Sequence, residues 1–232
     1  MHEPTSRPES TGEPPVRTGR MTIVNAHSAS TMPGFVERAE ELLDEHHVVA
    51  CTRNLGARER FAVELVRHFH LMPDAQTVVL SGAAIHDLES FCHQLERGLP
   101  MAGKLAHMRR SIDGPGGVCE RMRDRPADLA SHIHYRYYIW RDADVLLKHN
   151  DRLFARLCDA LLGVAAEAEY ASEDLLLLHR VVFIGATALS ECYADESGPL
   201  RSWLKEPGTG AKPLWAVVSG VERPAVKLLE LP

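Results

Sequence analysis

Two acidic residues follow a run of apolar residues in the stretch RYYIWRDADVLL, residues 136–147. The four residues before Arg141 are apolar without alternation, as in a strand covered on both faces of a parallel sheet. Carboxylates directly after such a strand are suited to holding Mg²⁺ and activating water, because Mg²⁺ prefers oxygen ligands. Asp142 and Asp144 are therefore candidate residues of a site that hydrolyses nucleotides, with Arg141 beside them.

A second candidate stretch is CTRNLGAR, residues 51–58, between an apolar run and a helical pattern. A phosphate loop reads G-x-x-x-x-G-K-[ST]: its backbone N–H groups surround the phosphates, its lysine reaches the outer phosphates and its hydroxyl binds Mg²⁺. Of these signature residues only Gly56 is present. Cys51 stands at the first glycine position, Ala57 at the lysine position and Arg58 at the hydroxyl position. An arginine can contact phosphate but cannot bind Mg²⁺.

Arg58 and Arg60 add positive charge beside the N-terminus of the helix expected after this stretch, where anions are favoured. The candidate remnant of a phosphate-binding loop is therefore Gly56, Ala57, Arg58 and Arg60. The alternative interpretation is a tight strand-to-helix turn that requires Gly56, with the arginines on the surface.

The elements that would position these residues alternate between short apolar runs and helical patterns. Strands are expected within residues 46–52, 77–82, 134–140, 179–186 and 213–220, and helices within residues 32–45, 57–72, 85–99, 150–170 and 186–194. Strands that alternate with helices of this length predict right-handed crossovers and a mostly parallel sheet. The expected fold class is α/β, a three-layer sandwich with a five-stranded sheet.

The order of these elements, with DAD after the third strand, resembles the core of a P-loop NTPase of the AAA+ type over residues 33–220. The resemblance implies ATP and Mg²⁺ as ligands, and a metal-binding Asp followed by a water-activating Glu after the third strand. It also implies a polar sensor residue at the end of the fourth strand. Relatives of this type commonly assemble head to tail and build sites across subunit interfaces.

The acids of the third strand do not fit both positions of the family pattern. One register places Arg141 at the metal position and Asp142 at the glutamate, and the next places Asp142 at the metal and Ala143 at the glutamate. Either register lacks a carboxylate on which phosphoryl transfer depends. Thr187 matches the sensor position, although a helix N-cap explains it equally well. The alternative for Asp142 and Asp144 is a strand-end cap with an ion pair to Arg141.

These losses predict a catalytically degenerate AAA+-like protein that acts as an interaction or regulatory module, without a cofactor and through a protein partner or homo-oligomer. The remnant catalytic positions are Arg58, Asp142, Asp144 and Thr187. The alternative is an atypical ATP-binding protein or ATPase that uses ATP and Mg²⁺.

Composition bounds the remaining possibilities. The chain has 232 residues, 45% of them hydrophobic, and a formal net charge of −6. Residues 1–20 hold four prolines and predict a disordered tail, which leaves 21–232 as a single domain. The five cysteines are spread without a CxxC, and neither secretory nor membrane-spanning apolar runs occur, so a cytoplasmic protein without a membrane association is expected. The pairs His68/His70 and His132/His134 lack a third ligand, so no metal site is predicted.

The connection between the second and third strands, residues 100–131, is basic. Over residues 101–125 only three acids face six basic residues, which are Lys104, Arg109, Arg110, Arg121, Arg123 and Arg125. Residues 159–196 hold eight acids against Arg180 alone. This asymmetry suits head-to-tail self-association, an acidic partner or a nucleic-acid backbone, and a nucleic-acid-associated factor is the further alternative for function. Two solvated faces are the simpler interpretation.

Overall fold

A computed structural model describes residues 32–99, 133–168, 170–171, 176–195, 197–200 and 225–232. The predicted tail 1–20, the basic connection 100–131 with its six basic residues, and the strand predicted at 213–220 lie outside the described residues. The expectations for these three segments therefore stay predictions.

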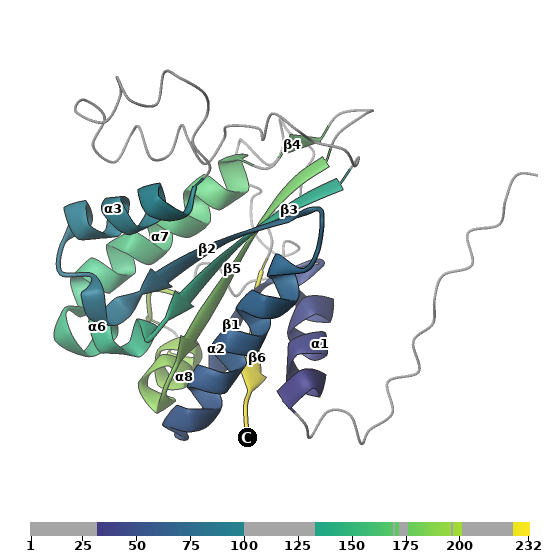
Figure 1. Ribbon diagram of the computed structural model, residues 1–232. Coiled ribbons are helices and arrows are strands. Elements are labelled where there is room, and N and C mark those ends of the chain that lie inside the picture. The colour runs from purple at the N-terminus through teal and green to yellow at the C-terminus, as the bar shows by residue number, and fades with distance from the viewer. Residues whose placement is uncertain (1–31, 100–132, 169, 172–175, 196, 201–224) are drawn as a thin grey trace, which may run out of the picture.

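A single sheet organises the described residues (Figure 1). Its strands are β1 (His47–Cys51), β2 (Ala75–Ser81), β3 (Ile133–Arg141), β5 (Leu176–Gly185) and β6 (Val226–Glu230), and they pair in parallel in the order β2-β3-β5-β1-β6. The short strand β4 (Tyr170–Ala171) pairs antiparallel with β5. The sheet is thus mostly parallel, as the alternation of strands and helices predicts.

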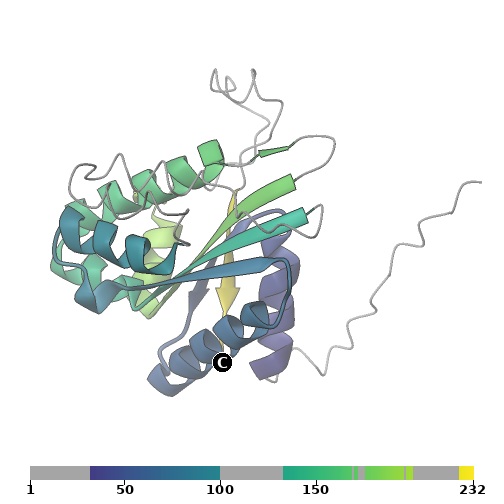
Figure 2. The same ribbon diagram turned by 45° about the horizontal axis from the view of Figure 1, so that its top comes forward.

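Helices cover both faces of this sheet (Figure 2). On one face lie α1 (Met32–Leu43) and α2 (Leu55–His70). On the other lie α3 (Leu88–Gly98), α6 (Ala143–His149), α7 (Asp151–Ala168) and α8 (Thr187–Ala194), with the 3-10 turn η2 (Gly82–Ala84) after β2. The protein is therefore a three-layer α/β sandwich with a mostly parallel sheet, which confirms the predicted fold class.

Residues of the central strands alternate between two hydrophobic cores. Tyr138 and Trp140 of β3 pack in the core under α3 and α7, whereas Tyr137 and Ile139 pack in the core under α1 and α2. All four side chains are buried. A strand buried on both faces needs apolar residues at successive positions, which explains why this strand is recognisable in the sequence.

Besides the short elements β4 and η2, two elements differ from expectation. The fifth parallel strand of the described sheet is β6, five residues long, which pairs with β1 at the chain's C-terminal end. The sequence pattern did not predict it, because its buried residues do not alternate regularly and a lysine, Lys227, lies within it. The helix α6, seven residues long, was also missed, because so short a segment shows barely two turns of helical period.

Arg180 of β5 fastens the C-terminal end of α1 to the sheet. Its guanidinium donates to the carbonyl oxygens of Leu43 at 2.8 Å and Asp44 at 3.1 Å, and to the carbonyl of His179 at 2.8 Å. The last carbonyls of a helix lack partners within the helix, so a buried arginine fork satisfies groups that would otherwise be orphaned. The arginine that stands alone among the acids of residues 159–196 thus has a structural role.

Candidate functional site

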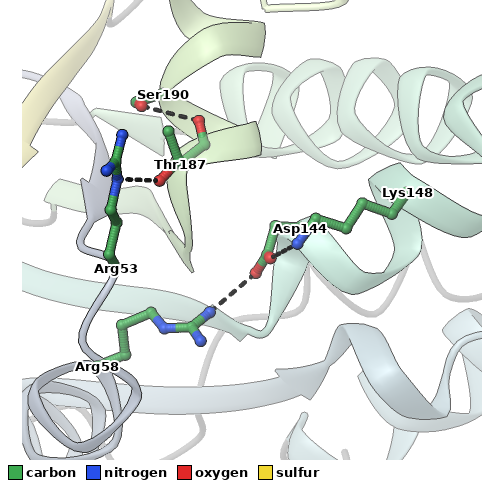
Figure 3. Close-up of polar contacts among 6 residues, drawn as sticks. All are labelled: Arg53, Arg58, Asp144, Lys148, Thr187 and Ser190. Atoms are coloured by element: carbon green, nitrogen blue, oxygen red, sulfur yellow. Dashed lines mark hydrogen bonds and ion pairs between the residues drawn. The ribbon is translucent and has the colours of Figure 1, made fainter.

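The candidate residues lie at the carboxyl ends of β1, β3 and β5, on the same side of the sheet (Figure 3). Ligands of open α/β sheets bind beyond these carboxyl ends. Arg58 comes from the first turns of α2, Asp144 from the first turn of α6, and Thr187 from the start of α8. The structure therefore brings two of the four predicted remnant positions, Arg58 and Asp144, into contact although they are 86 residues apart in the chain, while Thr187 contacts Arg53 (Figure 3).

The segment matched to a phosphate loop is a capped helix start. The Asn54 side chain accepts a hydrogen bond from the Ala57 N–H at 3.1 Å, and the Asn54 carbonyl accepts from the Arg58 N–H at 3.1 Å. Backbone N–H groups that a phosphate loop would present to a ligand are thus used within the protein. Ala57 is buried and so forms part of the core rather than a ligand contact.

Gly56 lies inside α2, not in the turn that precedes the helix. A Cβ at this position would meet Asn54 Oδ1 at 3.5 Å, which is an ordinary contact. The interpretation of a tight turn that requires Gly56 is therefore wrong, because another residue fits there without strain. Arg60, the other arginine of the segment, is exposed and donates to the Gly56 carbonyl at 3.2 Å.

An ion-pair network centred on the buried Asp144 side chain links α6 to α2. Arg58 Nη1 lies 3.2 Å from Asp144 Oδ1, and Lys148 Nζ lies 3.0 Å from Asp144 Oδ2. The Asp144 side chain is 2% exposed and that of Arg58 13% exposed, whereas Lys148 is 56% exposed. Both oxygens of this buried carboxylate therefore face a cation of the protein itself (Figure 3).

Asp142 connects β3 to α6 in an unusual backbone conformation. It is the N-cap of α6, with φ of 50° and ψ of 37°, and among the described residues it is the one non-glycine residue with positive φ. Aspartate tolerates this left-handed region better than most residues do. Its side chain makes no capping hydrogen bond. The expected Arg141 ion pair is also absent among the described residues, because Asp144 pairs with Arg58 and Lys148 instead.

The backbone of Asp142 lies close against the backbone of Gly82. A Cβ on Gly82 would lie 2.1 Å from the Asp142 carbonyl oxygen and 2.8 Å from its carbonyl carbon. Only glycine leaves enough room for η2 to lie against the β3–α6 turn. Gly185, at the end of β5, is constrained similarly, since its Cβ would lie 2.9 Å from Asp144 Oδ1.

Thr187 is the first residue of α8, and Ala186 is the N-cap, so the interpretation of Thr187 as an N-cap is wrong. Its hydroxyl accepts a hydrogen bond from Arg53 Nε at 3.2 Å, and its carbonyl accepts one from the Ser190 hydroxyl at 2.9 Å. The position matched to a sensor residue thus contacts an exposed arginine of the β1–α2 loop (Figure 3).

The last residues of the chain lie against the same loop. The Leu231 N–H donates to the Cys51 carbonyl at 2.8 Å, and the Thr52 hydroxyl donates to the Pro232 carbonyl at 2.9 Å. Burial raises the pKa of the Cys51 thiol to about 12, with smaller contributions from the negative charges of Asp144 and Glu230. Cys51 therefore stays a protonated thiol near neutral pH and does not act as a nucleophile.

Sequence reasoning missed Arg53 and Lys148 as members of the site. The spacing of Asp144 and Lys148, four residues apart on a helix, is a signal for a local ion pair that was available. No comparable signal exists for Arg58 with Asp144, which are 86 residues apart, or for Arg53 with Thr187.

One histidine of each predicted pair has a structural position, while His70 is exposed and His132 lies outside the described residues. His68 Nε2 lies 2.7 Å from Glu40 Oε2, so that it connects α2 to α1, and His134 of β3 is buried. Within the described ranges no group of three or more His, Cys, Asp or Glu residues is placed to hold a metal ion. The helices of the same ranges include none long and apolar enough to cross a membrane.

The chain matches no family model, and it matches no curated protein. Among solved structures it is similar to a chain of "Structure of Drosophila ORC bound to DNA", with a TM-score of 0.47 and 14% identity over 99% of this chain and 38% of that chain. A chain of "Structure of Drosophila ORC bound to GC-rich DNA and Cdc6" gives a TM-score of 0.47 and 13% identity over 100% of this chain and 36% of that one. The protein thus spans less than two fifths of these chains, and likeness at this level concerns the fold alone.

Proposed function

We propose that this protein keeps a nucleotide-enzyme architecture without the chemistry, and that it acts as an AAA+-like interaction or regulatory module. The observation that carries the proposal is the state of Asp144. Its two oxygens face Arg58 and Lys148, so two cations of the protein already balance the negative charge that would attract Mg²⁺. A divalent cation placed beside this carboxylate would meet two positive side chains at short range.

Three further features support the same proposal. The N–H group of Ala57 is already capped by Asn54, the lysine of a phosphate loop is replaced by a buried alanine, and Thr187 is engaged by Arg53. Phosphoryl transfer depends on cations and dipoles aimed at the phosphates, with carboxylates that hold the metal. The described residues at the carboxyl ends of the strands offer neither arrangement, so we propose that the role is binding of another macromolecule.

Thermal unfolding with ATP and Mg²⁺ tests the loss of nucleotide binding. We expect the Tm of the full chain to stay unchanged at millimolar ATP, with or without Mg²⁺. A ligand at 100 times its Kd would stabilise the folded state by about 2.7 kcal/mol and so raise the Tm visibly.

The contrary result would be a rise in Tm that requires Mg²⁺ and is lost in Asp142→Asn. Asparagine is the suitable replacement because it tolerates the left-handed conformation of Asp142 while removing the negative charge. That result would establish the alternative function, an atypical ATP-binding protein.

A second candidate function is association with nucleic acid through the basic connection 100–131, favoured by the excess of six basic residues over three acids within residues 101–125. Fluorescence anisotropy with a labelled DNA duplex should then show affinity that falls steeply as salt increases, since phosphate contacts release counterions. Charge reversal at Arg109, Arg110, Arg121 and Arg123 should abolish it. Binding that is insensitive to salt, or no binding to DNA or RNA, rejects this candidate.

A further inference from the structure

The strand β2 is an edge strand of the described sheet: it pairs with β3 on one side, and its other side is a lateral edge of the sheet. The Tyr135 N–H donates to the Asp74 carbonyl, so the carbonyl group of Asp74 points toward β3. Because backbone groups alternate in direction along a strand, the N–H and C=O groups of Thr77 and Val79 point away from β3, toward the open edge.

One end of this open edge is closed by α3. Gln94 accepts a hydrogen bond from the Ser81 N–H at 2.7 Å and donates to the Ser81 carbonyl at 3.3 Å. The side-chain amide thus occupies the position of a neighbouring strand at Ser81. No described residue does the same for the outward backbone groups of Thr77 and Val79.

The sequence of β2 lacks the features that usually prevent an edge strand from pairing. It is seven residues long, AQTVVLS, and contains no charged residue, no proline and no glycine. Edge strands commonly carry charges, prolines or bulges that block pairing with another chain. Val79 is 40% exposed, and its register partner Ile139 places its side chain on the α1/α2 face.

We infer that this edge pairs with β2 of a second copy of the chain, antiparallel and centred on Val78. In this register Thr77 lies directly opposite Val79 of the second copy, and each such pair exchanges two N–H···O=C hydrogen bonds. The pairing is symmetric, so the same groups are satisfied in both copies.

A second copy is the occupant that the charges of this edge favour. In a symmetric pair each charged residue would face the same kind of charge on the second copy, which is destabilising. Because β2 carries no charged residue, it can pair with its own copy without this repulsion. The exposed Val79 side chain then packs against Thr77 of the second copy on the α1/α2 face. This assembly differs from head-to-tail association and does not depend on whether nucleotide binds.

Sedimentation of the full chain over a concentration series tests the pairing. We expect wild type to dimerise as concentration rises, Val79→Lys to associate about tenfold more weakly or not at all, and Val63→Lys to dimerise like wild type. Val63 is the matched control because it is an exposed valine, 56% against 40% for Val79, that belongs to α2 and not to β2. A wild type that remains monomeric, or equal behaviour of the two lysine variants, overturns the inference.

Hydrogen exchange of wild type gives a second readout that needs no variant. The amide protons of Thr77 and Val79 should exchange more slowly as protein concentration rises. Protection that is the same at every concentration would mean that another part of the chain covers the edge, and exchange that stays fast would mean that nothing does. Either result contradicts pairing with a second copy.

Discussion

Arg58→Met is expected to lower the free energy of unfolding by about 3 kcal/mol, because removing one member of a buried ion pair leaves the other charge without compensation. Asp144, whose side chain is 2% exposed, would keep only Lys148 as a partner. Methionine retains much of the apolar volume of the arginine stem, so the change reports mainly on the charge. Urea denaturation monitored by circular dichroism measures the effect.

Two controls separate the buried pair from ordinary surface charge. Lys148→Met removes the other cation, but this side chain is 56% exposed, so the expected loss is about 0.5 kcal/mol or less. The double variant Arg58→Met/Asp144→Leu removes both buried charges and should recover most of the stability lost in Arg58→Met. An Arg58→Met protein as stable as wild type would show that the network contributes nothing, and would remove the physical basis of the proposed loss of metal binding.

Gly82→Ala should also destabilise the protein by about 3 kcal/mol, because overpacking forces a backbone shift. Its Cβ would lie 2.1 Å from the Asp142 carbonyl oxygen, which belongs to a backbone already in the left-handed region. Neither η2 nor the β3–α6 turn can yield through a side-chain rotation. The same denaturation experiment provides the value.

Gly56→Ala is the matched control and should change stability in the opposite direction, by about 0.5 kcal/mol, since alanine favours a helix more than glycine does. A Cβ finds only Asn54 Oδ1 at 3.5 Å there. The two substitutions are chemically identical and differ in environment alone. Loss of stability in Gly56→Ala would restore the view that this glycine is required by the β1–α2 connection.

Continuous apolar runs made the central sheet predictable. Residues 134–140 and 179–186 were expected as strands, and the structure has β3 at Ile133–Arg141 and β5 at Leu176–Gly185. A strand covered on both faces is apolar at successive positions and does not alternate with polar residues. It can therefore be recognised in the sequence without knowing which strands it pairs with. The helices α2 and α7 were predictable for a related reason, since long helices repeat their apolar stripe several times.

The pairings within the site were not predictable. Asp144 was recognised as a strand-end acid, but its partner Arg58 is determined by where β1 and β3 end in the sheet, not by local spacing. The left-handed conformation of Asp142 was likewise not predictable, since no local pattern marks it and the turn packs against Gly82, which is distant in the chain. Local patterns report which face of an element is buried, whereas contacts across the sheet depend on strand order and register.

The hydrogen bonds of the Arg180 guanidinium affect how the protein unfolds. Since this guanidinium is bonded to carbonyls at the end of α1, that helix cannot detach from the sheet without breaking two charge-assisted hydrogen bonds of Arg180. Detachment of α1 and unfolding of β5 are therefore expected to occur as one cooperative event. A shortened chain that begins after Asp44 would lose both of these carbonyl acceptors, so α1 is an integral part of the folding unit.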